Sequence, residues 1–395
     1  MNEKMRQLGT SPSAIRELFE YGKKRKAEIG EDNVFDFSIG NPSVPSPQVV
    51  NETLKYLIDN TEATKLHGYT SAVGDLNVRK AIKEYLNNKY NCNANESLIY
   101  LTAGAAASLT ITLNAIINPG DEVIVLAPYF PEYKVFSEKA NATVKVVNCN
   151  FDTFIPDFEL LKTSISPKTK AVFINYPNNP TGVVLSKEDM AKLANVLKSA
   201  QKTFNSTIYL ISDEPYRELV YGDIEVPYVT NYYDNTIVCY SFSKSLSLPG
   251  ERIGYILVSS SCTKAADVYF AICGAGRSLG YVCAPALFQY MIPYCLGHTT
   301  DISVYEANRN ILYDELTSFG YNVVKPDGAF YIFVKALEDD AVAFSKKAKE
   351  YELLLVPSDS FGIKGYVRIS YCVTNKQVKD SLPSFKKLIE SYKGE

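Results

Sequence analysis

Short apolar runs rich in β-branched residues alternate with helix-length segments through the middle of the chain, and this alternation limits the possible folds most. Strands buried on both faces of a parallel sheet have nearly continuous apolar sequences. The sequence therefore predicts an α/β fold, with a mainly parallel sheet between layers of helices. The expected strands are Ser97–Thr102, Glu122–Ala127, Thr143–Val147, Ala171–Asn175, Ile208–Ser212 and Ile237–Tyr240.

Helix-length segments lie between several of these strands, among them Ala106–Ile117 and Lys187–Lys202. Ser186 directly precedes the second segment and Asp189 follows three residues later, a pattern that caps the N-terminus of a helix. In parallel sheets of this kind, ligands bind beyond the carboxyl ends of the strands. The residues that follow each strand are therefore the candidates for a functional site.

The pattern changes after about residue 285. Helices are expected at Ile302–Phe319, near Asp340–Tyr351 and from about Lys376 to Tyr392, with strands near Tyr321–Val324, Ala329–Val334 and Tyr366–Tyr371. This mixture indicates a smaller α+β domain. We expect an N-terminal segment at residues 1–45 that packs with the small domain, a large domain at 46–285 and the small domain at 286–395.

Composition excludes several classes of protein. The 395 residues carry a net charge of −3, which argues against a broad nucleic-acid surface. His67 and His298 are the only histidines, so we expect neither a histidine-rich metal site nor paired histidine catalysis. The sequence shows no apolar signal core at its start and no membrane-spanning run of about 18 apolar residues. The eight scattered cysteines read as reduced thiols, and we expect a cytoplasmic protein that does not bind membranes.

Two segments that follow strands have small or aromatic residues. Thr102–Ala107 opens a helix with small residues, which let backbone N–H groups approach a phosphate, although any tight strand-to-helix turn needs small residues as well. Ala127–Pro131 places aromatic side chains on a proline-constrained turn, where core packing and stacking on a ligand ring are both possible.

Three further segments carry polar groups after strands. Asn179 lies in a turn stiffened by Pro180, and Asp213 lies at the end of a strand, where a carboxylate needs a cap, a cation or water. Lys244 follows the strand Ile237–Tyr240, with Arg252 eight residues later. A lysine in a crevice can lose its proton and form an imine, although most lysines are solvated surface groups. Together, these segments can converge on one crevice.

At this point the chain resembles the class I/II aminotransferases, the fold-type-I family that uses pyridoxal 5′-phosphate (PLP) and includes aspartate aminotransferase. The resemblance covers nearly the whole chain. It rests on Ser38–Pro42, on Tyr69 and Gly74 with Leu76 and Arg79, and on Asn179–Gly182, Asp213–Tyr216, Ser241–Lys244, Arg252–Gly254, Pro326–Tyr331, Phe361–Gly362 and Arg368.

The resemblance implies a role for each matching residue around PLP, which the large domain would hold. Lys244 corresponds to the lysine that binds the cofactor covalently and later carries protons. Asp213 would pair with the pyridinium nitrogen, and Tyr216 and Asn179 would hydrogen-bond the ring oxygen O3′. The stacking position on the ring is taken by Phe130. The phosphate would be bound by the backbone of Gly104, Ala105 and Ala106 and by Ser241, Ser243 and Arg252.

The resemblance also implies substrate contacts and a partner. Arg368 would bind the α-carboxylate of the amino acid, because a planar guanidinium matches a carboxylate in a way that lysine does not. Gly40 would lie against the substrate. Tyr69 resembles a residue that reaches the cofactor phosphate of the neighbouring subunit, which implies a homodimer with shared active sites.

The implied reaction is a ping-pong transfer of an amino group from an L-amino acid, with aspartate or alanine weakly favoured, to a 2-oxo acid such as 2-oxoglutarate. A PLP-dependent C–S β-lyase or decarboxylase remains an alternative, because the same fold supports several bond cleavages. A regulator would need an appended DNA-binding module, for which the segment before Asp36 is too short.

Three features depart from the family pattern. Ala105 and Ala106 offer the phosphate no side-chain hydroxyl. No lysine follows Gly104, where one subgroup of the family has a lysine that binds the side-chain carboxylate of the substrate. Ser358 replaces a common glycine and leaves the closure of that loop in doubt. Arg277 lies close to the position at which other members have a second arginine. Binding to substrate, a place in an interface and an ordinary solvated surface position are all possible for it.

Overall fold

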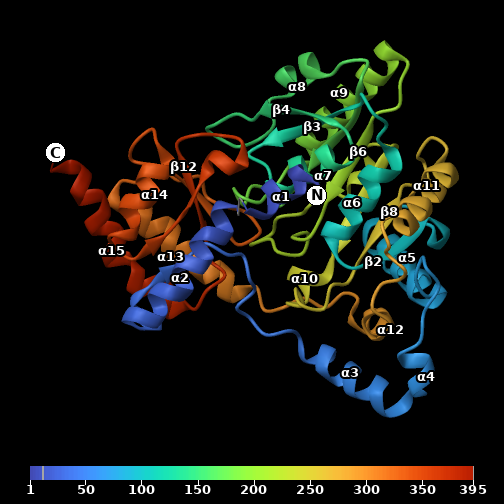
Figure 1. The fold of residues 1–395 in the computed structure, drawn as a ribbon, viewed down its shortest axis with the longest axis horizontal. Helices are drawn as coiled ribbons and strands as arrows, with labels where there is room; N and C mark the ends of the chain where they lie inside the picture. The colour runs from blue at the N-terminus through green and yellow to red at the C-terminus, as the bar shows by residue number, and fades with distance from the viewer. Residues whose placement is uncertain (11–12, 395) are drawn as a thin grey trace.

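A seven-stranded sheet forms the centre of the larger part of the molecule (Figure 1). The computed structural model describes residues 1–10 and 13–394. The strand order is β2-β8-β7-β6-β5-β3-β4. Strands β3 to β7 run parallel, whereas β8 pairs antiparallel with both β2 and β7. The strands are β2 (Ile99–Thr102), β3 (Glu122–Ala127), β4 (Thr143–Asn148), β5 (Thr169–Ile174), β6 (Tyr209–Asp213), β7 (Thr236–Ser241) and β8 (Gly254–Val258).

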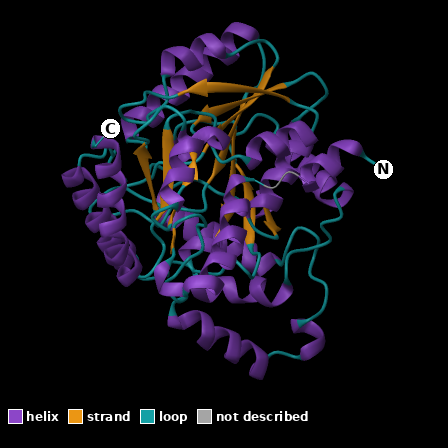
Figure 2. Ribbon diagram, turned by 60° about the vertical axis from the view of Figure 1, so that its left-hand side comes forward, coloured by secondary structure: helices purple, strands orange, loops and turns teal. Residues whose placement is uncertain are grey.

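Helices cover both faces of this sheet (Figure 2). The helices of this larger part are α3 (Gln48–Asn60), α4 (Ala63–Leu66), α5 (Leu76–Tyr90), α6 (Ala105–Ile116), α7 (Glu132–Lys139), α8 (Phe158–Ser164), α9 (Lys187–Phe204), α10 (Phe242–Ser245), α11 (Ala265–Ser278) and α12 (Ala286–Cys295). Helices α3 and α4 lie away from the sheet, at the lower right of Figure 1. Helix α6 packs against β7, β8 and α11. Its buried residues are apolar or small, so it can lie deep in the molecule and bring its N-terminus to the end of the sheet.

The smaller part contains two short sheets. Strands β11 (Val356–Pro357), β12 (Tyr366–Ser370) and β9 (Tyr331–Lys335) form an antiparallel sheet, and β1 (Phe35–Asp36) pairs parallel with β10 (Leu353–Leu354). Helices α13 (Ser303–Phe319), α14 (Ala341–Lys349) and α15 (Asn375–Lys393) pack around them, and α2 (Ala14–Ile29) contacts β11. Helix α1 (Glu3–Thr10) precedes α2. The N-terminal strand therefore belongs to a sheet completed by the C-terminal region.

The buried apolar residues form two cores, one around each set of sheets. Phe37 and Val44 from the N-terminal segment lie in the core of the smaller part. Met291 and Cys295 of α12 lie in the core of the larger part, where α12 packs on α3 and α5. The division of the chain into domains at 1–45, 46–285 and 286–395 stays a prediction.

The structure confirms the α/β fold with a mainly parallel sheet, and it corrects two details. The expected strand Tyr321–Val324 is wrong, because only Val323 makes an isolated bridge, to Val334. Strand β8 was not among the predicted strands, although Gly254–Val258 is buried throughout. The cap of α9 is confirmed: the Ser186 hydroxyl accepts from the Asp189 backbone, and the Asp189 side chain accepts from the Ser186 backbone.

Three further observations concern the functional class. No described helix is both long enough and apolar enough to cross a membrane. All eight cysteines are free, and the cytoplasmic location expected from them stays a prediction. Among residues 1–10 and 13–394, no cluster of three or more histidine, cysteine or acidic side chains could hold a metal ion.

Candidate active site

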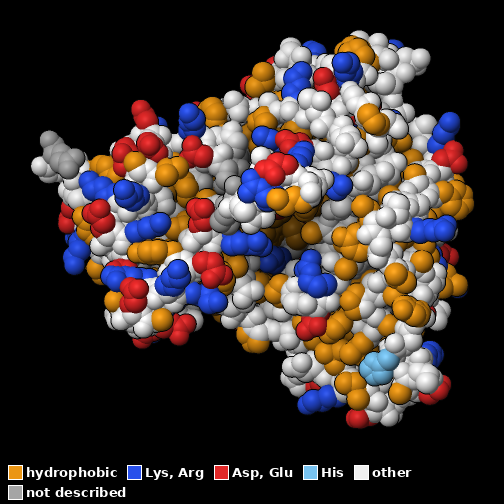
Figure 3. Space-filling model, in the orientation of Figure 1, with side chains coloured by type: hydrophobic (Ala, Val, Ile, Leu, Met, Phe, Trp, Pro, Cys, Tyr) orange, Lys and Arg blue, Asp and Glu red, His pale blue; other side chains and the backbone are white. Residues whose placement is uncertain are grey.

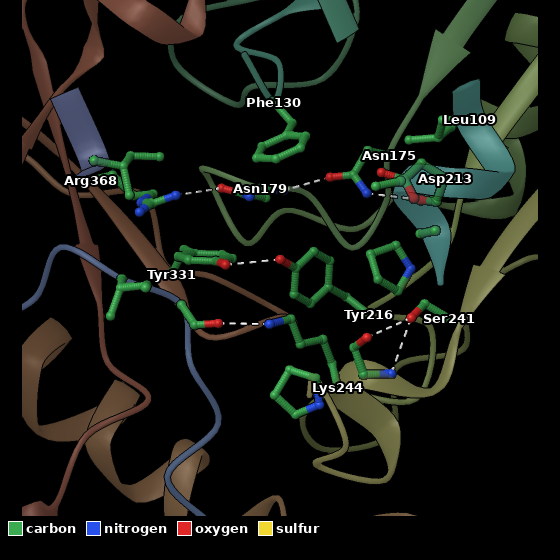
Figure 4. A pocket seen from close by; sticks show the side chains of 18 of the residues that line it. Leu109, Phe130, Asn175, Asn179, Asp213, Tyr216, Ser241, Lys244, Tyr331 and Arg368 are labelled. Atoms are coloured by element: carbon green, nitrogen blue, oxygen red, sulfur yellow. Dashed lines mark hydrogen bonds between the residues drawn. The ribbon is translucent and has the colours of Figure 1, made fainter. Parts of the chain in front are cut away.

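A cavity of about 290 Å³ lies where the carboxyl ends of the parallel strands meet the smaller part of the molecule (Figures 3 and 4). Most of the predicted site residues line it: Gly40, Ala105, Ala106, Phe130, Asn179, Asp213, Tyr216, Ser241, Ser243, Lys244, Arg252 and Arg368. Ile15, Ile39, Leu109, Asn175 and Tyr331 also line it and were not predicted. The topology therefore brings segments from every third of the chain to one place.

An anion site lies at one end of the cavity, at the N-terminus of α6. Gly104 precedes this helix with a φ of +86°, and a β-carbon there would lie 2.6 Å from Nη2 of Arg252. Ser241 Oγ and Ser243 Oγ are 2.7 Å apart, and Arg252 Nη1 lies 3.5 Å from Ser243 Oγ. Free N–H groups of a helix start, two hydroxyls and a guanidinium form a donor set suited to a phosphate.

Asp213 ends strand β6 and is buried. Its Oδ2 accepts a hydrogen bond of 2.5 Å from the hydroxyl of Tyr133, whereas its Oδ1 has no partner among the described residues. Burial raises the pKa of Asp213 to about 7, and the hydrogen bond from Tyr133 acts against this rise. A buried carboxylate oxygen without a partner is costly, so Oδ1 is suited to a ligand that donates a proton or carries a positive charge.

Lys244 lies on the short helix α10, directly after β7. Its Nζ donates a hydrogen bond of 2.7 Å to the backbone oxygen of Gly40. Burial, together with the smaller effects of the cations Arg252 and Arg368, lowers the pKa of Lys244 to about 8. A larger fraction of this amine is therefore neutral near pH 7 than of an exposed lysine, and the neutral amine is the form that acts as a nucleophile.

Arg368 lies on β12 at the opposite end of the cavity, and it is buried. Its Nη1 donates to Asn179 Oδ1 at 3.1 Å and its Nη2 donates to the Ser38 backbone oxygen at 2.5 Å. The guanidinium stands 4.7 Å from the centre of the Tyr331 ring. Its contacts in the described chain are thus to neutral groups, and a carboxylate is the ligand that would neutralise it.

Tyr216 and Tyr331 share a hydrogen bond of 2.9 Å between their hydroxyls (Figure 4). Both are buried, and Tyr331 belongs to the segment Pro326–Tyr331. A β-carbon at residue 40 would overlap the Tyr331 hydroxyl, so this position requires glycine. The sequence analysis did not name Tyr331 as a site residue. It could have done so, because Tyr331 ends the motif Pro326–Tyr331, which is part of the family resemblance.

Two predicted residues lie away from the cavity. The Tyr69 side chain is 89% exposed. Arg277 is exposed on α11 and lines a separate cavity with Tyr100, Tyr281 and Val282. Ser358, which replaces a common glycine, is buried, and its hydroxyl accepts from the Tyr366 backbone N–H at 3.1 Å. Neither Tyr69 nor Arg277 touches the cavity of its own chain.

The residues present fit PLP. The anion site matches its phosphate, the free Oδ1 of Asp213 matches a protonated ring nitrogen, and the Lys244 amine lies in the same cavity. Phe130 provides an aromatic ring at the cavity wall, where it can stack on a flat ligand (Figure 4). The arrangement therefore offers a separate contact for the phosphate, the ring nitrogen and the ring face.

Comparisons with known proteins agree with this geometry. The family model described as aminotransferase class I and II matches residues 32–384. The chain is 30% identical to the probable aspartate aminotransferase of Methanocaldococcus jannaschii, with 96% of this chain and 97% of that protein covered. It is likewise 30% identical to the aspartate aminotransferase of Thermotoga maritima, covering 95% of this chain and 97% of the relative.

Solved structures show the same similarity. An aminotransferase from Eubacterium rectale superposes with a TM-score of 0.97 at 55% identity, covering 99% of both chains. The aspartate aminotransferase of Thermus thermophilus with maleate superposes with a TM-score of 0.86 at 25% identity, covering 97% of this chain and 98% of that chain. With a matching family model over most of its length and these relatives, the chain belongs to the class I and II aminotransferases, and it is a PLP-dependent transaminase.

Proposed function

We propose that this enzyme transfers the amino group of an L-amino acid to a 2-oxo acid such as 2-oxoglutarate by a ping-pong mechanism, with alanine and aspartate as the first donors to test. The observation that carries the proposal is the convergence of Lys244, Asp213 and Arg368 on one cavity. When bound, PLP accepts the amino group and withdraws electrons from the α-carbon of the substrate.

Each of these three side chains has a distinct task in the proposed reaction. Arg368 binds the α-carboxylate and so fixes the orientation of the amino acid. Asp213 keeps the ring nitrogen of the cofactor protonated through its free Oδ1. Lys244 carries the proton between the α-carbon and the cofactor, a role that suits an amine whose pKa burial lowers to about 8.

The cavity has few cationic side chains. Among its described lining residues only Lys244, Arg252 and Arg368 carry a cationic side chain. The three cations already serve the cofactor and the α-carboxylate in this proposal. A second substrate carboxylate would therefore need a cation from a partner subunit, for which Arg277 is the candidate.

We further propose that the enzyme is a homodimer. Large apolar side chains are exposed on α3, on the chain around residue 69 and on α11 and α12, namely Tyr56, Ile58, Tyr69, Leu76, Phe270 and Tyr294. Apolar side chains also gather at the lower right of Figure 3, over the region of α3 and α12 in Figure 1. Contiguous exposed apolar surface is typical of a protein–protein interface.

The test is a half-reaction without an oxo-acid acceptor. The loaded enzyme is mixed with alanine, aspartate, an aromatic amino acid or cysteine, and the absorbance of the cofactor and the released products are followed. A transaminase releases one equivalent of the matching 2-oxo acid per site, and added 2-oxoglutarate then restores the starting spectrum. Release of carbon dioxide, or of pyruvate and sulfide from cysteine in many turnovers, would show a decarboxylase or a β-lyase instead.

Two variants sharpen the assignment. Lys244→Ala should abolish turnover with every donor, and near-normal transamination would show that another lysine acts. If Arg277 of a partner subunit binds the second carboxylate, Arg277→Ala should lower the activity with aspartate and leave the activity with alanine unchanged. Equal effects on both donors would exclude that role for Arg277.

A further inference from the structure

Tyr133 lies behind the site, on helix α7, and the sequence analysis did not single it out. Its side chain is buried, and its hydroxyl donates the hydrogen bond of 2.5 Å to Asp213 Oδ2. Its ring stacks on Phe173 of β5, with ring centres 4.7 Å apart and planes 4° from parallel. Because Tyr133 does not line the cavity, it reaches the site only through its neighbours.

The hydrogen bond determines how Asp213 presents its two oxygens. A carboxylate can rotate about its last side-chain bond, and a partner on one oxygen removes that freedom. Tyr133 takes Oδ2, and Oδ1 is left without a partner in the described chain. Since Asp213 lines the cavity, the free oxygen is the one available to a ligand.

Tyr133 also contacts the aromatic wall of the cavity. The rings of Tyr133 and Phe130 meet edge to face, with a centre-to-centre distance of 5.6 Å and an interplanar angle of 79°. The backbone N–H of Tyr133 donates to the backbone oxygen of Phe130 at 3.0 Å. One buried side chain therefore contacts both Asp213 and Phe130, the two groups proposed to meet the edge and the face of the cofactor ring.

We propose that Tyr133 is a positioning residue for the cofactor ring, which holds Asp213 ionised with Oδ1 directed at the ring nitrogen and fixes Phe130 beside the ring. The proposal rests on the proposed role of Asp213. It is physically reasonable because a hydrogen bond donated to a carboxylate stabilises the charged form, and that charge in turn keeps the ring nitrogen protonated.

Other ionisable groups face Asp213 as well. They are Glu214 and Tyr216 on its own segment and Cys239 on the neighbouring strand β7. Glu214 raises the pKa of Asp213, and burial raises it more strongly, whereas the hydroxyl of Tyr133 lowers it. Tyr133→Phe removes the lowering contribution and keeps the ring that stacks on Phe173. The carboxyl group of Asp213 should then hold its proton more readily and bind the ring nitrogen less well.

The test compares Tyr133→Phe with Tyr233→Phe in the full-length protein. Tyr233 is a matched control, because it is buried in the same core and its hydroxyl donates to the Ile208 backbone oxygen at 2.7 Å, outside the cavity. For Tyr133→Phe, the dissociation constant for PLP should rise by up to about tenfold, because Asp213 then holds its proton more readily and its free oxygen is no longer fixed. Tyr233→Phe should bind PLP like the wild type.

Spectroscopy gives a readout that a purely structural role would not change. A positive charge on the ring nitrogen disfavours a proton elsewhere on the conjugated cofactor. With that charge weakened, the pH-dependent change in the absorption band of the bound cofactor should move to higher pH in Tyr133→Phe and stay in place in Tyr233→Phe. The melting temperatures of the two PLP-free variants should fall by similar amounts.

Two outcomes separate the failure of this inference from the failure of the proposed role of Asp213. If Asp213→Asn impairs PLP binding while Tyr133→Phe leaves affinity and spectrum unchanged, Tyr133 has only a structural role and the inference is overturned. If Asp213→Asn has no effect on PLP affinity or spectrum, the proposed contact with the ring nitrogen is wrong, and the inference is overturned with it.

Discussion

Burial changes the ionisation of individual residues in the cavity, and these changes have measurable consequences. Lys244 and Asp213 differ in sign of charge, but for both of them burial favours the neutral form. The lowered pKa of Lys244 means that the unfolded chain binds more protons than the folded chain between about pH 8 and 10.5. In that window, the contribution of Lys244 to stability rises with pH.

Lys244→Met should therefore stabilise the PLP-free protein relative to the wild type at pH 7, and this advantage should shrink as the pH approaches 10. The lowering of the lysine pKa from 10.5 to about 8 corresponds to about 3 kcal/mol at most, and the lost hydrogen bond to Gly40 reduces it. Urea unfolding at pH 7 and 9.5 measures the difference. The exposed Lys198→Met should show no such trend, and a pH-independent difference for Lys244→Met would contradict the argument.

The residues with proposed chemical roles could be predicted from sequence to lie in one cavity, and their supporting neighbours could not. Lys244 and Asp213 lie at or just after the ends of strands, and Arg368 is part of the family resemblance. For these three residues, the sequence therefore shows both the reactive side chain and its position in the fold. Tyr133 acts only because helix α7 turns it toward β6, and nothing in its local sequence specifies that direction. Ile15 reaches the cavity from the N-terminal helix α2, which depends on how distant segments pack.

At the scale of elements, the antiparallel strand β8 connects the two halves of the anion site. Gly254 begins β8 and pairs with Ser241 at the end of β7 and with Thr102 at the end of β2. A β-carbon at Gly254 would overlap the Tyr240 backbone oxygen and lie 3.3 Å from the α-carbon of Gly104. The close approach of the three strands at this point therefore requires glycine.

Gly254→Ala should separate these strands and weaken the anion site. Overpacking of this kind costs about 1–3 kcal/mol in unfolding free energy. The affinity for PLP should fall as well, because Ser241 and Gly104 both contribute to the proposed phosphate contacts. Gly274→Ala on α11 is the control: its β-carbon would meet nothing within 4 Å, and alanine should raise stability by up to about 1 kcal/mol in a helix. Wild-type PLP affinity in Gly254→Ala would contradict this account.

The elements were predicted best where the pattern is strongest. Strand β3 has the predicted bounds Glu122–Ala127, and α9 starts where its cap indicates. Strand β8 was missed, although it is an apolar run, because its opening glycine is usually a sign of a turn. The residues at Tyr321–Val324 are rich in strand-forming types, but only Val323 finds a strand to pair with.

At the scale of the whole molecule, Tyr69 and the cavity are separated within one chain. Tyr69 is 89% exposed and does not line the cavity of its own chain, so its proposed contact with a cofactor phosphate requires a neighbouring subunit. If the proposed dimer shares its sites, a mixed dimer of Lys244→Ala and Tyr69→Ala subunits contains one site with both residues intact. Random mixing after unfolding and refolding should then restore activity to about a quarter of the wild type.

Sedimentation equilibrium should show dimers for both variants and for the mixture. A mixture whose activity only averages the two separate variants would contradict the assignment of Tyr69 to the partner site. Mixing Lys244→Ala with Asp213→Ala is the control, because both changes affect the same cavity. In the mixed dimer each of the two cavities carries one of the changes, so no intact site forms and activity should stay low.

The N-terminal segment that leads from β1 to the cavity also contacts the cationic groups of the PLP-free site. Its backbone oxygens at Ser38 and Gly40 accept hydrogen bonds from Arg368 and Lys244. A peptide oxygen is an uncharged acceptor, and a carboxylate binds a guanidinium more strongly. Residues 38–40 thus supply one uncharged acceptor to each of the two cationic groups in the PLP-free chain, and a substrate carboxylate at Arg368 would compete with the Ser38 oxygen.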